Sequence, residues 1–434
     1  MSLQDMPVNN VLSEEYKLTT EPVVMDNAVE YEWHEIQSDV LASANPRATN
    51  WRLQLKNLNA YVNPARAYLE ISCRLTDNAN PPVELGADVN AAIQNHILSL
   101  FSRATLRVGG QIVETVNEAH VAKAIVQPLL HYSHDYASSS GTNEMFYPDG
   151  PGLGTIIVPY AANDDNAAYN EGHRRRYDRA NNKEFHAWVP LSALFGFCSV
   201  DRILTNNDFI VELQKSDQKH HVLSAAGTEL VAVRKVSIWM PNVLPKSVVD
   251  LSLKSAFADG VLSNYMYPQL QCYTTNQPQA GTGNFRIVTS SEKVLYAFVV
   301  ARAANRTATA SAATTLDNIN TLEVRLNGRQ YPLQPYTNLK GDTVDKSRAY
   351  SDTLRYMNRN YDFSSGINLS YEKWAKTTIY SFDFTSQPEA NMGAPATLEL
   401  KATTDAAVEW SVCVLSEKRA QIRYDGGSAV VLVN

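Results

Sequence analysis

The two halves of this chain repeat one order of sequence features, and this repeat constrains the fold more than any other property. Each half contains a hairpin signal between two β-rich runs, Gly109-Gly110 in the first half and Asn327-Gly328 in the second. Both pairs can supply the positive φ angles of a two-residue type I′ turn. Because an internal repeat indicates two copies of one structural unit, we expect two similar domains in succession.

The elements after each hairpin follow in the same order. A short helical pattern comes first, and a long polar stretch, an aromatic strand, a strand ending in an acid and leucine, and a long apolar strand follow. The ranges, in this order, are 117–127, 131–183, 184–189, 208–213 and 231–240 in the first half, and 345–358, 359–373, 378–384, 396–400 and 408–415 in the second. Short alternating strands bounded by turn residues are typical of antiparallel sandwiches. The sequence therefore predicts an all-β chain of two sandwiches rather than one barrel.

Two prolines mark the expected boundary between the sandwiches. Pro241 and Pro245 follow the last strand of the first half, and proline cannot donate to a β ladder. We divide the chain into an N-terminal arm (1–27), a first sandwich (28–243), a second sandwich (244–418) and a C-terminal tail (419–434). The long polar loop at 131–183 is expected to project from the outer face, because loops of such length usually have a function.

The charge distribution argues against a coat for nucleic acid. The net charge is -7, and the first 30 residues contain six acids and one base, Lys17. No basic arm is therefore available at this end to neutralise phosphates. Charged residues make up only 19% of the chain, whereas tyrosine occurs 22 times, a composition that suits extensive protein contact.

Cysteines and apolar runs give two further expectations. The four cysteines are widely separated without a C-x-x-C pair, so we expect buried thiols rather than a zinc site or a disulfide framework: Cys73, Cys198, Cys272 and Cys413. The longest apolar run, 294–301, is far too short to cross a bilayer, and the N-terminus lacks a signal pattern. A cytosolic or nuclear origin is expected.

No motif for catalysis or cofactor binding in the sequence indicates an enzyme. The glycine-rich stretch 150–155 lacks the lysine of a phosphate-binding loop. His131 and His134, followed by Asp135, have a spacing that would place both imidazoles on one side of a helical turn. We interpret them as part of a surface loop. Weaker candidates for metal binding or acid-base chemistry are His220 and His221, which we place in a polar turn at 215–228, and Asp164, Asp165 and Asp383. We expect no catalytic, cofactor-binding or metal-binding residue.

A dense basic cluster lies inside the long polar loop. It comprises His173, Arg174, Arg175, Arg176 and Arg179, between two runs of polar residues. We interpret it as a solvated loop or an ion-pair patch between subunits.

The ordered motifs resemble a family of viral proteins. The stretch from Asn95 to Thr115, which contains HILSLFSRATLRVGGQIV, resembles a strand and hairpin of the major capsid proteins of Polinton-like and adintovirus-like DNA viruses. The resemblance continues through FHAWVPLSALF at 185–195, NTLEVRLNGRQYP at 320–332 and YSFDFT at 380–385, and covers about Tyr31 to Leu415. The first hairpin departs from the pattern, since it has Gly-Gly where the family often has Asn-Gly.

The resemblance implies a double jelly roll: two consecutive eight-stranded antiparallel jelly rolls with short helices in the loops. It implies a homotrimeric, pseudo-hexameric capsomer of an icosahedral shell, with penton and minor capsid proteins as partners and no sequence-specific nucleic acid. The expected location is the virion, with assembly in the host cytoplasm or nucleus. Whether a membrane underlies the shell is left open.

Two other functions compete with this expectation. One is a carbohydrate-binding or hydrolytic β-sandwich protein, in which aromatic side chains would form sugar platforms. Five of the six tryptophans fall in or beside predicted strands, which argues against platforms built on loops. The other is a minor capsid or spike protein with a single jelly roll, against which the internal repeat argues.

Overall fold

A computed structural model gives the conformation of most of the chain. It describes residues 30–39, 48–56, 60–77, 79, 83, 85, 91–149, 171–181, 183–205, 207–224, 227–260, 262–289, 293–309, 319–340, 346–356, 369–377, 379–385, 395–425 and 428–433. The expected arm at 1–27 lies outside these residues, as do the stretch 150–155 and the pair Asp164 and Asp165.

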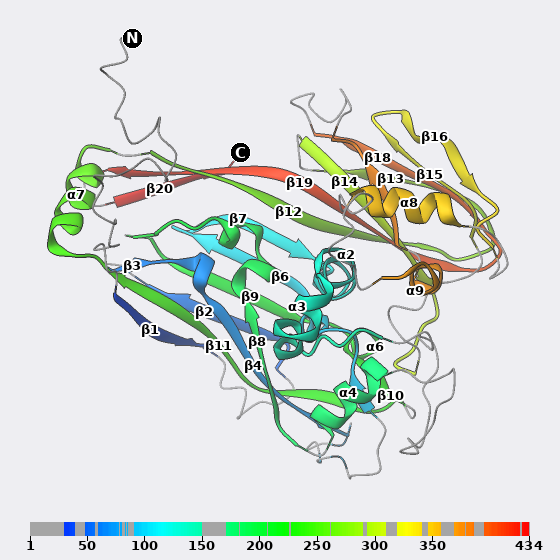
Figure 1. Cartoon of the computed structure of the whole chain (residues 1–434), viewed down its shortest axis with the longest axis horizontal. Helices are drawn as coiled ribbons and strands as arrows, with labels where there is room; N and C mark the ends of the chain where they lie inside the picture. Colours follow the sequence, from blue (N-terminus) through cyan, green and yellow to red (C-terminus); the bar gives the residue numbers. More distant parts are fainter. Residues whose placement is uncertain are drawn as a thin grey trace, which may run out of the picture.

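Two sheets form the first sandwich (Figure 1). One has the strand order β1 (Glu30–Gln37), β11 (Leu230–Leu244), β4 (Tyr68–Thr76) and β8 (Phe185–Pro190), with β3 (Tyr61–Val62) also paired to β11. The other has the order β2 (Asn50–Leu55), β9 (Phe209–Lys215), β6 (Phe101–Val108) and β7 (Gln111–Asn117). A small separate pair consists of β5 (Ala91–Ile93) and β10 (Val222–Ser224).

The second sandwich also has two sheets. One has the order β12 (Leu262–Gln277), β19 (Val408–Asp425), β14 (Lys293–Ala303) and β17 (Ile379–Asp383), with β20 (Ser428–Val433) also paired to β19. The other has the order β13 (Gly281–Val288), β18 (Thr397–Thr404), β15 (Ile319–Leu326) and β16 (Arg329–Thr337).

The two sandwiches have the same topology. If the strands of these four-strand paths are numbered from one to eight along each half, both halves read 1-8-3-6 in one sheet and 2-7-4-5 in the other. All the pairings are antiparallel, and this eight-strand arrangement in two sheets is a jelly roll. The predicted all-β double jelly roll is therefore confirmed, including the order of its repeated elements.

Both predicted hairpins form as their sequences indicate. Gly109 and Gly110 join β6 to β7 with φ angles of 56° and 80°, and Asn327 and Gly328 join β15 to β16 with 49° and 87°. Two successive positive φ angles are the signature of a type I′ turn, whose twist matches that of the flanking strands.

Short helices lie in the connections, and the connection between β7 and β8 contains more of them than any other described connection. That connection contains α1 (Ala119–Val121), η5 (Ala122–Val126), α2 (Gln127–His131), α3 (His134–Ser138), η6 (Ser140–Glu144) and α4 (Glu171–Ala180). The equivalent connection between β16 and β17 contains α8 (Ser347–Tyr356) and α9 (Tyr371–Thr377). The remaining helices are η3 (Pro64–Arg66), η4 (Ile97–Leu100), α5 (Leu191–Leu194), η7 (Gly196–Ser199), α6 (Gln218–His221) and α7 (Ser247–Ala258).

Pro241 lies inside β11, so the expectation that it ends the first run of strands is wrong. It is the register partner of Trp33 in β1, and its carbonyl accepts a hydrogen bond from the backbone N–H of Asn63 at 3.2 Å. The N–H and C=O of one strand residue point to the same edge. The missing N–H of Pro241 therefore lies where β11 changes partner from β4 to β3, a break at which a ladder can include proline.

Residues 419–434 were expected to form a tail, and this is also wrong for the residues described. The strand β19 continues to Asp425, and β20 returns along it with Ala420 opposite Val433. Ala420, Ile422 and Tyr424 are buried on the face that covers the first jelly roll. These side chains alternate with polar ones, a pattern that fits a half-buried strand.

The long strands β12 and β19 join the two jelly rolls (Figure 1). Their ends beside α7 lie over β7, and the hydroxyl of Tyr267 donates a hydrogen bond to the carbonyl of Val113 at 2.8 Å. Tyr265 stacks on Phe197 of η7 with ring centroids 4.7 Å apart. The buried apolar residues of both halves consequently form one continuous cluster.

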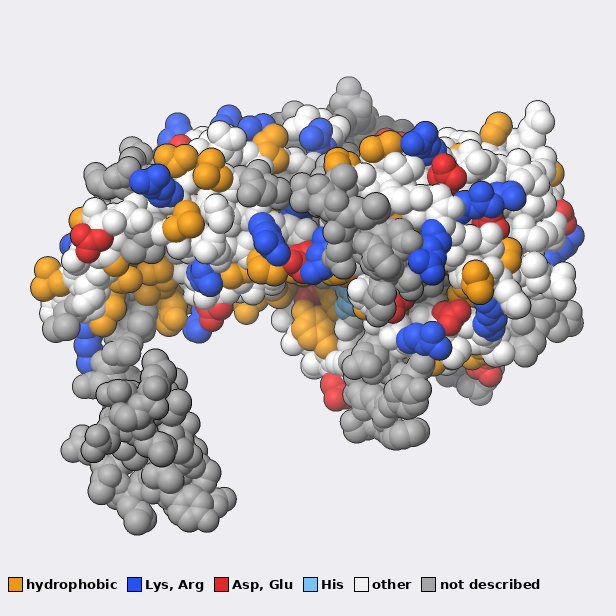
Figure 2. Space-filling model, turned by 90° about the horizontal axis from the view of Figure 1, so that it is seen from above, with side chains coloured by type: hydrophobic (Ala, Val, Ile, Leu, Met, Phe, Trp, Pro, Cys, Tyr) orange, Lys and Arg blue, Asp and Glu red, His pale blue; other side chains and the backbone are white. Residues whose placement is uncertain are grey.

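The other face of these strand ends is exposed. Figure 2 shows apolar and basic side chains spread over this upper side of the molecule, with fewer acidic ones. The exposed apolar residues include Leu262 and Met266 of β12 and Val430 and Leu432 of β20.

Candidate assembly surfaces

The basic cluster in the long connection forms a helix rather than a solvated loop. In α4, Arg174 pairs with Asp178 at 3.6 Å, and Arg175 pairs with Glu171 one turn earlier. These pairs have the i, i+4 spacing that brings side chains together on a helix.

The other two arginines of α4 point into the protein. Arg176 is buried and binds Asp149 Oδ1 at 2.5 Å and the carbonyl of Tyr147 at 2.7 Å. Arg179 donates to the carbonyls of Thr142 and His186. The predicted solvated loop or intersubunit patch is therefore wrong for Arg176 and Arg179, because these side chains fasten the connection to its own jelly roll.

The histidines of the 131–135 motif do not share a helical turn. His131 ends α2, Tyr132 is extended, and His134 starts α3 after the N-cap residue Ser133. His131 instead contacts the hydroxyl of Tyr356 in α8. Among the described residues, no group of three or more His, Cys, Asp or Glu side chains could hold a metal ion.

A buried network beside these histidines was missed by sequence reasoning. The carboxylate of Glu144 accepts hydrogen bonds from the hydroxyls of Tyr132 and Tyr136, both at 2.5 Å, and lies 2.7 Å from His96 Nε2. The backbone N–H of Leu98 donates to His96 Nδ1 at 3.0 Å, so Nε2 carries the proton and donates to Glu144. His96, Tyr132 and Glu144 are buried and Tyr136 is half-buried, and the network fixes the loop containing η6 to the first jelly roll.

The pair His220 and His221 lies buried in the short helix α6, so the expectation of a polar turn is wrong for these two residues. The ring of His220 lies 3.8 Å from that of His120, and its Nδ1 is 2.9 Å from Arg306 of the second jelly roll. Burial, with the guanidinium groups of Arg302 and Arg306, holds the pKa of His120 well below its ordinary value. These groups belong to the junction between the jelly rolls. Asp383, by contrast, is exposed at the end of β17, where it binds Thr385.

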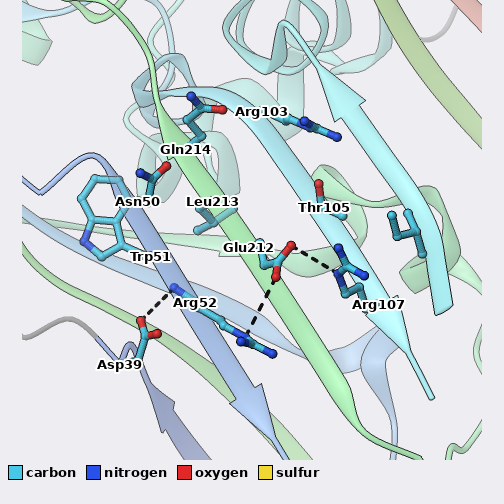
Figure 3. Close-up of a pocket in the computed structure, with 11 residues that line it drawn as sticks. Asp39, Asn50, Trp51, Arg52, Arg103, Thr105, Arg107, Glu212, Leu213 and Gln214 are labelled. Atoms are coloured by element: carbon cyan, nitrogen blue, oxygen red, sulfur yellow. Dashed lines mark hydrogen bonds and ion pairs between the residues drawn. The ribbon is translucent and has the colours of Figure 1, made fainter. Parts of the chain in front are cut away.

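An open groove of about 420 Å³ crosses the exposed face of the sheet β2-β9-β6-β7 (Figure 3). Arg52 Nε and Arg107 Nε lie 4.0 and 3.3 Å from the two oxygens of Glu212, and Asp39 accepts a hydrogen bond from the backbone N–H of Arg52. Arg103 also lines the groove. Both acids are engaged by donors of the groove itself, unlike the pair of opposed carboxylates that glycoside hydrolysis requires. This surface suits polar contact with another macromolecule.

The exposed face of the sheet β1-β11-β4-β8 is aromatic. Trp33 is 48% exposed, Tyr68 39% and Trp188 38%. The ring centroids of Trp33 and Tyr68 lie 6.1 Å apart, and those of Trp188 and Trp239 lie 5.8 Å apart. The sequence had indicated that these tryptophans lie in strands. It did not indicate their side, because the outward positions of a strand can be aromatic when another surface covers them.

The predicted state of the cysteines is confirmed. Cys73, Cys198, Cys272 and Cys413 are free and buried. Within the described part of the chain, no helix is both long and apolar enough to span a membrane.

Known proteins were compared with the chain at the level of sequence and fold. A family model described as a double jelly roll-like domain matches residues 158–415, more than half of the chain. The chain belongs to the double jelly roll-like family. Curated proteins gave no sequence match.

Solved structures with the double jelly roll fold align over nearly the whole chain. A chain of the Sputnik virophage structure has a TM-score of 0.61 at 11% identity and covers 98% of this chain and 92% of that one. A chain of the PBCV-1 virus capsid has a TM-score of 0.53 at 11% identity and covers 93% of this chain and 97% of that one. The Faustovirus major capsid protein has a TM-score of 0.53 at 9% identity and covers 96% of this chain and 94% of that one. At such identities the likeness concerns the fold.

Proposed function

We propose that this protein is a major capsid protein of an icosahedral DNA virus and has no enzymatic role. The observation that carries the proposal is the pair of topologically identical jelly rolls in one chain. The matching folds of a capsid chain from PBCV-1 and of the Faustovirus major capsid protein support it. So do the large exposed aromatic and apolar surfaces, which are expected where a protein meets copies of itself.

We propose further that three copies form a pseudo-hexameric capsomer. Each copy contributes two similar sandwiches, so three copies give six similar sides, and repeated head-to-tail contacts of this kind can close a ring. With it we propose a division of the chain into an arm (1–27), jelly rolls at 28–243 and 244–418, and a short C-terminal segment. This last segment is part of the second jelly roll's sheet rather than a tail, because β20 pairs with β19. Penton and minor capsid partners, assembly in host cytoplasm or nucleus, and a Polinton-like or adintovirus-like source remain parts of this proposal.

Light scattering of the purified chain tests the proposal. We expect a species of about three times the chain mass of 48.2 kDa, or larger multiples as capsomers join. Electron microscopy of concentrated protein should show shells or sheets. A stable 48.2 kDa monomer at micromolar concentration that never forms particles would contradict the capsid proposal.

A further inference from the structure

The two jelly rolls differ in what lies on one equivalent face. In each, the sheet that contains strands one, eight, three and six has an outward face, turned away from the other sheet of the same jelly roll. In the second jelly roll, Phe298 and Cys272 are both register partners of Cys413 and share this face. Arg302, opposite Glu409, lies on it too. In the first jelly roll, Trp239 is the register partner of both Glu35 and Tyr68 on the corresponding face.

The outward face of the second jelly roll is buried within the chain. Cys272, Phe298, Arg302 and Cys413 are all buried. Tyr356 packs on Phe298 with ring centroids 4.6 Å apart.

The first jelly roll supplies much of this cover. Arg306, just beyond β14, binds His220 at 2.9 Å and the carbonyl of Lys219 at 3.2 Å. The pKa of Glu118, which precedes α1, is raised by burial and responds to the charges of Arg302 and Glu409. His131 of α2 contacts Tyr356, the residue that packs on Phe298, with ring centroids 5.7 Å apart. Parts of two connections of the first jelly roll, β7–β8 and β9–β10, therefore lie against the outward face of the second.

The outward face of the first jelly roll has no such cover among the described residues. It presents the rings of Trp33, Tyr68 and Trp188, each more than a third exposed. This aromatic surface is not balanced in charge. Lys235 bridges Glu35 at 2.7 Å and Glu70 at 2.8 Å, which leaves an excess of one carboxylate. Glu184, just before β8, and Arg74 of β4 add one charge of each sign on this face.

The second jelly roll has a helix equivalent to the one that covers the buried face. Its connection between β16 and β17 corresponds to the connection between β7 and β8, and it begins with α8. Arg348 and Arg355 are exposed on α8, whereas its one acid, Asp352, binds the hydroxyl of Tyr336 at 2.7 Å. The exposed side of α8 is thus basic, and the uncovered face of the first jelly roll is acidic and aromatic.

We propose that the outward face of the sheet β1-β11-β4-β8 is the docking surface for α8 of a second copy of this chain. The contact repeats between chains the cover that the first jelly roll provides inside one chain, and it rests on the proposed capsid function. Exposed tryptophans supply most of the binding free energy in such interfaces, because they remove large apolar areas from water. The opposite charges select the orientation and accelerate association.

Paired tryptophan substitutions give the first test, with sedimentation velocity as the measurement. The variant Trp33→Ala with Trp188→Ala is expected to raise the dissociation constant of the oligomer at least about tenfold, as for hot-spot residues. The control is Leu251→Ala, since Leu251 is 67% exposed in α7 and lies outside both the docking surface and α8. It should leave the dissociation constant unchanged. Thermal unfolding confirms that each variant is folded.

Charge reversal gives a second test that does not depend on the tryptophans. Arg348→Glu with Arg355→Glu should weaken association, and so should Glu35→Lys with Glu184→Lys. All four changes in one chain should restore association, because each interface then regains opposite charges. Loss of association without restoration would place these residues in separate contacts and overturn the proposal.

The outcomes separate this inference from the proposed function. If the unmodified chain forms oligomers and the tryptophan variant associates equally well, the docking surface is wrong and the capsid function stands. If the tryptophan variant loses binding to soluble oligosaccharides but assembles normally, the aromatic face is a sugar platform and the inference fails. A monomeric unmodified chain would contradict the capsid function itself.

Discussion

Gly196 shows how closely the two jelly rolls approach each other. A Cβ atom at this position would lie 1.7 Å from the carbonyl oxygen of Pro268. The N–H groups of Gly196 and Phe197 both donate to the buried carboxylate of Glu114, at 3.0 and 2.9 Å. The loop is therefore held on one side by the first jelly roll and pressed on the other by the second.

Gly196→Ala should lower the free energy of unfolding by about 3 kcal/mol or more, at the upper end of overpacking costs, because the clashing atom belongs to the backbone. Urea unfolding followed by tryptophan fluorescence measures it. Gly110→Ala is the matched control, because a Cβ there has no atom within 4 Å and only the left-handed backbone opposes it, at about 1 to 2 kcal/mol. Equal losses in the two variants would contradict a steric junction at Gly196.

His221 makes the stability depend on pH. Ser216 Oγ donates to the carbonyl of Ser99, so its 2.9 Å contact with His221 Nδ1 requires the imidazole to donate. The buried Nε2 has no hydrogen-bond partner among the described atoms, and burial lowers the pKa of His221 to about 3. The folded state thus holds the neutral ring.

Because the pKa of His221 is lower in the folded state than in the unfolded chain, the unfolded chain binds the extra proton between about pH 6.5 and pH 3. The stability is complete above this range and falls as the pH decreases through it, by about 2 kcal/mol from pH 6.5 to pH 5 for this group. Urea midpoints across the range should show the slope. His221→Gln should reduce it, and an unchanged slope would show that other groups cause it.

The candidate site residues were only partly predictable from sequence. Absence of a metal motif was inferred from spacing, but the buried partner of His96 is Glu144, 48 positions away, and no local signal connects them. His220 was placed in a polar turn because its neighbours are polar. In the structure His220 contacts Arg306 of the other jelly roll, 86 positions away, and no local sequence pattern reveals such a contact.

At the scale of elements, the loop around η6 is fixed rather than free. The carbonyl of Gly141 accepts a hydrogen bond from the N–H of Phe146 at 3.0 Å, and Gly141 is buried. Arg179 of α4 binds the next carbonyl, that of Thr142. An insertion tag near Gly141, a position that looks suitable from its polar neighbours in sequence, would break these contacts.

A short tag inserted after Gly141 should therefore lower the thermal midpoint and the yield of soluble protein. The same tag after Gln279, in the exposed turn between β12 and β13, should leave both unchanged. Differential scanning fluorimetry compares the two variants. If the tag at Gly141 were as well tolerated as the control, the packing of η6 would be less important than its contacts indicate.

Repeated elements were the most predictable part of the fold, because hairpin turns and alternating strands depend on local sequence. The turns at Gly109-Gly110 and Asn327-Gly328 need positive φ angles, which few residues adopt. Pro241 and the strand β20 were less predictable, since both depend on pairing with distant segments. The exposure of Trp33 on the outward face of β1 was also not predictable, because alternation along a strand does not tell which of its two faces packs on the other sheet.

At the scale of the whole molecule, the two jelly rolls share one core. Tyr265 and Tyr267 of β12 pack on Phe197 of the first jelly roll, and the buried apolar cluster is continuous across both. Separating the halves would expose these rings to water. We therefore expect the two jelly rolls to unfold together in one cooperative transition.

Scanning calorimetry of the dissociated chain should therefore show one unfolding transition rather than two. Agreement between the calorimetric and van't Hoff enthalpies checks this. Gly196→Ala, which disturbs the junction alone, is expected to broaden or divide the transition. Two well-separated transitions in the unmodified chain would show that the junction contributes little.

The pairing of β12 with β19 has a mechanical consequence. Each of the 16 residues of β12 has a register partner in β19, from Leu262 with Arg423 to Gln277 with Val408. The hydrogen bonds of an antiparallel pair run across the strands, so a pull along the ribbon loads them together in shear instead of opening them one after another. The molecule is therefore expected to resist extension most strongly along the direction of β12 and β19.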